Sequence, residues 1–172
     1  MITIAIGILI VALVSTGGDW VWYELGVRHR ATAGILHGAV LLTAVGGVIG
    51  AAAGRFLRGL PLGAAAGVGG ALVYYALAPA LGYAAMIVAW ALLWILLALF
   101  DALLLRPGQR SLGQAIARGS VAAMLGGLAF WLVVDTLWGR PHGAERSYFM
   151  QFLAWAFAWA PGILALTVRT KA

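Results

Sequence analysis

Residues 83–105 read YAAMIVAWALLWILLALFDALLL, an apolar stretch whose one charged residue is Asp101. A helix of about 20 apolar residues is long enough to cross the hydrocarbon core of a bilayer. Five further apolar blocks flank this stretch, and short clusters rich in Arg, Gly and Pro separate them. We therefore expect an all-α integral membrane protein, a compact bundle of about six transmembrane helices with short loops that forms one domain over residues 1–172. The expected spans are residues 2–23, 33–53, 61–78, 83–105, 119–138 and 148–168.

The composition supports this class. Of the 172 residues, 64% are hydrophobic and 9% are charged, and the mean hydropathy is +1.01, whereas about a quarter of the residues in a soluble domain are charged. The formal charge of +6 arises from basic residues near the ends of the spans, as the positive-inside rule expects, so we expect no nucleic-acid partner. The absence of cysteine excludes disulfides and thiolate metal ligands.

The distribution of basic residues predicts an orientation. We call the face on which the first span begins face Y and the opposite face X. Six spans return the chain to face Y, and basic residues favour the cytoplasmic side. This count predicts an inner-membrane protein with both termini inside, although the two arginines after the first span argue for the reverse. Face Y would hold Arg55, Arg58, Arg106, Arg110, Arg118, Arg169 and Lys171, and face X would hold Arg28, Arg30, Arg140 and Arg146.

Small residues recur every four positions in several spans. Lipid provides no hydrophobic drive for helices to associate, so close backbone contact through small residues takes its place. We expect packing within the bundle, with a homo-oligomer or another membrane protein as the alternative partner, and a close antiparallel hairpin of the second and third spans. The clearest rows are Gly34/Gly38, Gly46/Gly50/Gly54, Gly59/Gly63/Gly67, Ala115/Gly119/Ala123/Gly127 and Ala154/Ala158/Gly162.

Tryptophans four residues apart occur in two spans, Trp90 with Trp94 and Trp155 with Trp159, each pair within an Ala-Trp-Ala-x-x-Trp motif. Residues at this spacing lie on one face of a helix. We interpret them as packing or lipid-contacting residues, and the shared motif as a sign of a repeated helical hairpin.

Most acidic and imidazole groups fall on face X. The first of them, Asp19, directly follows Gly17-Gly18, which is expected to interrupt the first span. Ionisable groups within a membrane face the bundle interior or a polar cavity and are functional candidates. One interpretation is a polar and aromatic pocket open to face X. The other is structural: Asp19 caps a helical turn, Asp135 pairs with Arg140, and His37 donates to a carbonyl. The candidate ligand-binding residues are Asp19, Trp20, Trp22, Tyr23, Glu24, His37, Asp135 and Trp138.

Other chemistry finds little support. The His and acidic residues lack the spacing of a metal site, and the sequence contains neither a P-loop nor a GxSxG motif. We therefore expect no metal site and no catalytic residues, and no cofactor can be named. Asp101 is expected to form an ion pair with Arg106.

Three functions remain open, and no motif assigns a family. The first is a transporter-like or ligand-binding protein, whose partners are the lipid bilayer and a small-molecule ligand; the expected break in the first span favours it. The second is an accessory subunit of a larger membrane complex. The third is an intramembrane enzyme that uses His37 and carboxylates.

Overall fold

The computed structural model describes residues 2–24, 26, 31–138 and 147–168, and this part of the chain is helical without strands. Six helices are long and apolar enough to cross a membrane, one for each expected span. They are α1 (Ile2–Glu24), α2 (Ala31–Ala52), α3 (Phe56–Leu81), α4 (Ala85–Phe100), α5 (Leu112–Trp138) and α6 (Tyr148–Thr167). A short 3₁₀ turn, Gly82–Ala84, precedes α4, and a π-helical turn, Asp101–Leu105, continues it.

Three boundaries differ from the sequence prediction. Helix α1 runs unbroken through Gly17 and Gly18, so the expected interruption is wrong; a glycine costs a helix only about 1 kcal/mol. Helix α3 begins at Phe56 rather than at residue 61. Helix α5 begins at Leu112 rather than at residue 119, because Ser111 and Gln114 form a capping box.

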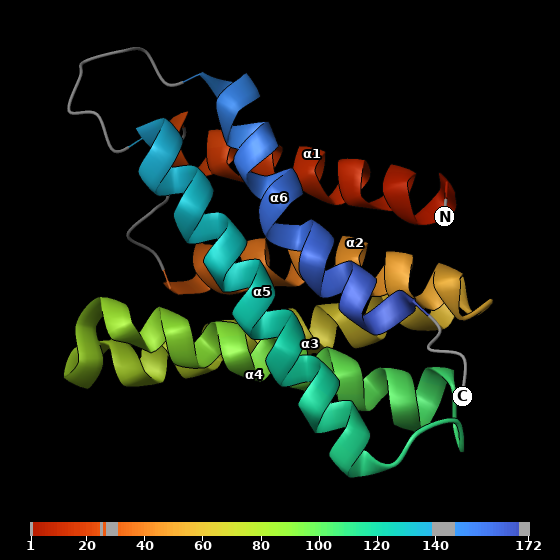
Figure 1. Ribbon diagram of the computed structural model, residues 1–172. Coiled ribbons are helices and arrows are strands. Elements are labelled where there is room, and N and C mark those ends of the chain that lie inside the picture. The colour runs from red at the N-terminus through yellow and green to blue at the C-terminus, as the bar shows by residue number, and fades with distance from the viewer. Residues whose placement is uncertain (1, 25, 27–30, 139–146, 169–172) are drawn as a thin grey trace.

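Successive helices run in opposite directions, so α1 begins and α6 ends at the same face of the bundle (Figure 1). Helices α5 and α6 form an antiparallel pair that crosses the other helices at a marked angle. Contacts link α1 to both α2 and α6, and α4 to both α3 and α5. The first and last helices therefore pack together and close the bundle.

A glycine seam joins α2 to α3. A Cβ built at Gly46 would lie 2.6 Å from Gly63 Cα, and one at Gly50 would lie 2.9 Å from Gly59 Cα. These neighbours are backbone atoms, which cannot move aside as a flexible side chain can. The predicted close hairpin through Gly46, Gly50 and Gly63 is thus confirmed, and the two helices approach as closely as glycine allows.

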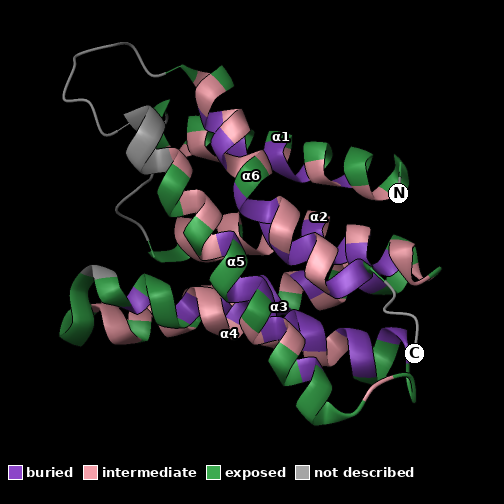
Figure 2. Cartoon of the chain, viewed as in Figure 1, coloured by how far each residue is buried: buried purple, intermediate pink, exposed green. Residues whose placement is uncertain are grey.

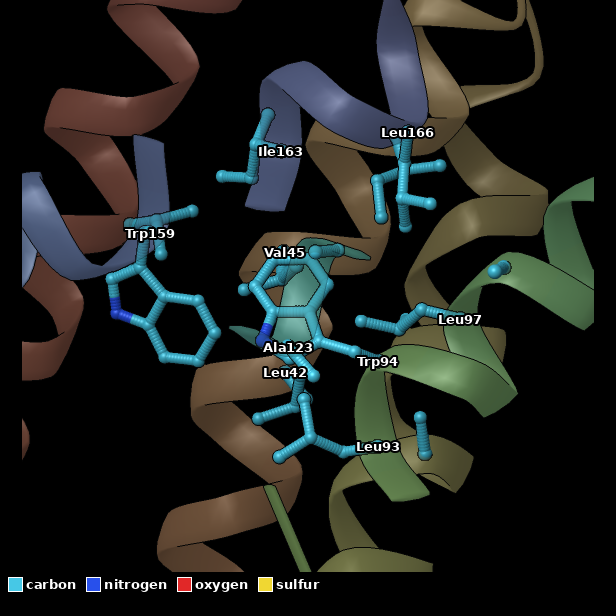
Figure 3. Packing of buried hydrophobic residues seen from close by; sticks show 14 of the residues in the cluster. Leu42, Val45, Leu93, Trp94, Leu97, Ala123, Trp159, Ile163 and Leu166 are labelled. Carbon is cyan, nitrogen blue, oxygen red and sulfur yellow. The ribbon is translucent and has the colours of Figure 1, made fainter. Parts of the chain in front are cut away.

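The core lies where α2, α4 and α6 meet. Buried residues concentrate there, whereas the outward faces of the helices are largely exposed (Figure 2). Trp94 and Trp159 are fully buried with ring centroids 5.7 Å apart, and Leu42, Val45 and Ile163 surround them (Figure 3). Trp90 and Trp155 adjoin the same group. All four repeated tryptophans therefore pack within the bundle.

A charged cluster lies at face Y, around the π-helical turn. Asp101 is 1% exposed and accepts hydrogen bonds from Arg106 Nε at 2.8 Å and Arg110 Nη1 at 2.6 Å. The predicted pair of Asp101 with Arg106 is confirmed, and Arg110 is a second partner. Arg106 Nη2 also donates to the Leu166 carbonyl at 3.4 Å, so the cluster ties the end of α4 to the end of α6.

Candidate functional site

The carboxylate of Asp19 lies between α1 and α6, one and a half turns from the X end of α1. Its Oδ2 accepts hydrogen bonds from Gln151 Nε2 and Trp155 Nε1, each at 2.5 Å. Gln151 and Trp155 are four residues apart on α6, so both side chains point toward the same strip of α1. Both donors are neutral, and they hold the carboxylate at the α1–α6 interface.

A second polar contact lies one turn deeper along the same interface. Ser15 is fully buried; it donates to the Val11 carbonyl at 2.8 Å and accepts from Trp159 Nε1 at 2.9 Å. Asp19 and Ser15 are four residues apart, as are their partners Trp155 and Trp159. The α1–α6 interface is therefore a polar seam in which indole N–H groups of α6 meet oxygen atoms of α1.

The imidazole of His37 reaches this place from α2. A Cβ built at Gly18 would lie 2.7 Å from His37 Nδ1, so the ring occupies the space that a side chain at Gly18 would fill. The ring centroid of His37 is 5.7 Å from that of Trp22. The Asp19 carboxylate is close enough to interact electrostatically with the imidazole. A carboxylate and an imidazole from two helices thus lie together near face X.

The predicted site residues divide into three groups. Asp19, Trp22 and His37 come together as described. Glu24 instead accepts a hydrogen bond from Tyr148 Oη at 2.7 Å, and Trp20 and Tyr23 are 48% and 39% exposed, so the latter two face outward. Asp135 and Trp138 lie on the last turns of α5, but their side chains are outside the described residues, as is Arg140.

The Asp19 site is a polar contact between side chains of α1 and α6, and its carboxylate is partly buried. Two surface hollows are described, one at the α2–α3 turn beside Arg55 and Arg58 and one between α5 and α6 beside Arg118. Both lie toward face Y. Among the described residues no group of three His or acidic side chains is placed to hold a metal ion.

Three members of this site, Ser15, Gln151 and Trp155, were not among the predicted site residues. Ser15 and Gln151 are neutral polar residues in otherwise apolar spans, and each lies four residues from a site residue on the same helix. That spacing was a usable signal for Gln151 and Trp155. The sequence does not show which helix Gln151 and Trp155 face, because they are 132 and 136 residues from Asp19.

The comparisons with known proteins provide no identification: no family model, no curated protein and no solved structure matches the chain.

Proposed function

We propose that this chain is an integral membrane protein of the transport or ligand-binding class that binds a proton at Asp19 and His37, near face X. Six apolar helices support the membrane location. The observation that supports the site is that an imidazole from α2 lies against Gly18 of α1, next to the Asp19 carboxylate. Gln151 and Trp155 of α6 hold this carboxylate through hydrogen bonds. Ionisable groups inside a bundle are the usual parts of proton pathways.

A proton fits this geometry better than a larger ligand does. Two side chains already donate hydrogen bonds to the Asp19 carboxylate, and a proton needs no cavity. Carboxylate and imidazole groups are the side chains that exchange protons in pumps and transporters. Trp155 donates directly to the Asp19 carboxylate. Protonation of this carboxylate therefore alters a contact between α1 and α6. Proton binding is thereby linked to the packing of the two helices that close the bundle.

The two alternatives have less support. The hypothesis of an accessory subunit would be favoured if the glycine and tryptophan faces of the helices pointed outward. The structure instead buries four of these residues within the bundle: Gly46, Gly63, Trp94 and Trp159. An enzyme would need reactive groups around His37, and the contacts described for its ring are with Gly18 and Trp22 of α1.

We expect the loops of face X to be outside the cell, with the described ends of α1 and α6 inside. The absence of native cysteine makes this directly testable. In intact cells, a membrane-impermeant maleimide should label a Ser147→Cys variant at face X. A Gln109→Cys variant at face Y should react only after lysis. The reverse pattern would invert the orientation, and labelling of both in intact cells would contradict a membrane-spanning bundle.

Asp19→Asn should abolish proton movement through the protein. The test uses proteoliposomes that contain a pH-sensitive dye, with an imposed pH gradient and potassium–valinomycin to balance charge. The wild type should change the internal pH faster than empty liposomes do, between about pH 5 and 8 where imidazole normally changes charge. Asp19→Asn should fall to the rate of empty liposomes, because an amide cannot carry the proton.

Two neighbouring glycines provide a matched control for this experiment. Gly18→Val should slow the flux because the new side chain displaces the His37 ring, whereas Gly17→Ala should leave it unchanged because no atom lies within 4 Å of a Cβ at Gly17. Folding of each variant is checked by its elution in detergent. A folded Asp19→Asn variant with wild-type flux, or a wild type no faster than empty liposomes, would contradict the proposed proton site.

A further inference from the structure

A groove runs between α5 and α6 at face Y, far from the Asp19 site. Its volume is about 450 Å³, and its walls include Val121 and Leu125 of α5 and Leu164 and Val168 of α6. Val121 is 48% exposed and Leu125 is 46% exposed. The groove is therefore open and mostly apolar, and it lies on the outer surface of the bundle between the two helices.

Arg118 lies at one end of this groove. Its Nη2 donates to the carbonyls of Ala165 and Val168, near the end of α6. Its Nε is buried and has no hydrogen-bond partner among the described residues. A guanidinium has five N–H donors, so Arg118 caps α6 and keeps donor capacity beside the groove.

Positive charge exceeds negative charge around Arg118. The guanidinium is close enough to Arg106 and Arg110 to be repelled by both, and Asp101 is the carboxylate that attracts it. Asp101 is already hydrogen-bonded to the other two arginines. Arg106, 4% exposed, also has a buried Nη1 without a partner in the described part of the chain. Three guanidinium groups thus share one carboxylate, and the cluster favours an additional anion.

We propose that the groove binds one anionic phospholipid, with an acyl chain along Val121 and Leu125 and the phosphate at Arg118. The inference rests on the proposed membrane location but not on the Asp19 site. Phosphate oxygens accept strong hydrogen bonds from a guanidinium, and an acyl chain covers apolar side chains. A phospholipid carries a phosphate and an acyl chain in one molecule. These two parts match Arg118 and the apolar residues that line the groove.

The test measures which lipid the purified protein retains. Protein in mild detergent is mixed with equal amounts of phosphatidylglycerol and phosphatidylcholine, and bound lipid is counted by native mass spectrometry. The wild type should prefer phosphatidylglycerol by roughly tenfold, or about 1.4 kcal/mol. Both lipids carry a phosphate, but phosphatidylcholine also carries a choline cation, which the arginine cluster repels. Arg118→Gln should bind the two lipids equally, and Val121→Trp, which fills the groove, should lose both. Arg58→Gln, an exposed arginine at the same face, should keep the wild-type preference.

These variants separate a site from general surface charge. The proposal fails if Arg118→Gln keeps the preference, or if Arg58→Gln removes it equally. It also fails if the wild type appears as a lipid-free dimer that Val121→Trp dissociates, which would assign the groove to a second copy. If Arg118→Gln does not fold, Val121→Trp tests the proposal by itself. This variant leaves the arginine in place, and the proposal requires that it still lose phosphatidylglycerol.

Discussion

Gly46→Leu should destabilise the protein by more than about 4 kcal/mol, the range reached only by severe core or backbone defects. A Cβ at this position would lie 2.6 Å from Gly63 Cα and 2.7 Å from Gly63 N. Both atoms belong to the backbone of α3, so no side chain can rotate to make room. The two helices would have to separate along their whole interface. Thermal melting in detergent, followed by the loss of monodisperse protein, measures the effect.

Gly17→Ala is the matched control for steric overlap. Gly17 also lies inside a helix, but no atom is within 4 Å of a Cβ there, and alanine is favoured over glycine in a helix by about 0.5–1 kcal/mol. This variant should melt at or slightly above the wild-type temperature. Equal melting of Gly46→Leu and the wild type would show that the α2–α3 seam is not closely packed in solution.

Asp101→Leu should destabilise the protein by about 3–5 kcal/mol, because it leaves a buried charge without its partner. The side chain of Arg106 is 3% exposed and pairs with Asp101. Without the carboxylate, Arg106 must remain buried and unpaired or move outward and release the end of α6. The melting temperature in detergent should fall strongly.

The double variant Asp101→Leu/Arg106→Leu tests the cause. Replacing both members of a buried pair by apolar residues is often nearly neutral. Arg110 also loses its carboxylate, but its side chain is 13% exposed and can turn to solvent, so the double variant should melt well above the single one. Arg58→Gln, an exposed substitution at the same face, should change stability by less than about 0.5 kcal/mol. If the double variant were as unstable as Asp101→Leu, lost packing rather than an unpaired charge would be responsible.

Much of the fold could be predicted from sequence because each helix has its own local signal. Span length and hydropathy located all six helices, and the four-residue glycine rows identified the α2–α3 seam. The errors arose where local signals compete. The pair Gly17-Gly18 was interpreted as a break although an apolar helix tolerates it, and the Ser111–Gln114 capping box was assigned to a loop because the polar residues after it hid the start of α5.

The site could be predicted only in part. Asp19 and His37 were recognisable because an ionisable group in an apolar span requires an explanation. Trp20 was assigned to the site by proximity in sequence, but on a helix it points to another side than Asp19 does. Tyr23, four residues after Asp19, lies on the same side of α1 near its end and is 39% exposed. Gln151 was missed because an uncharged amide is a weak signal. Which helices are neighbours is not encoded in hydropathy, since lipid and helix surfaces are equally apolar.

The location of the Asp19 partners has a consequence for biosynthesis. Asp19 belongs to the first helix, and its partners Gln151 and Trp155 lie 132 and 136 positions later in the chain, on the last helix. Chains are synthesised from the N-terminus, so α1 is made long before either donor exists. The α2–α3 hairpin, by contrast, can form from neighbouring sequence while the ribosome is still translating. Until α6 is released, the Asp19 carboxylate and the Ser15 hydroxyl lack these partners, and a nascent chain that ends before Tyr148 cannot shield them. Synthesis of α6, rather than of any earlier helix, is thus the event that supplies these partners and allows α1 and α6 to pack together.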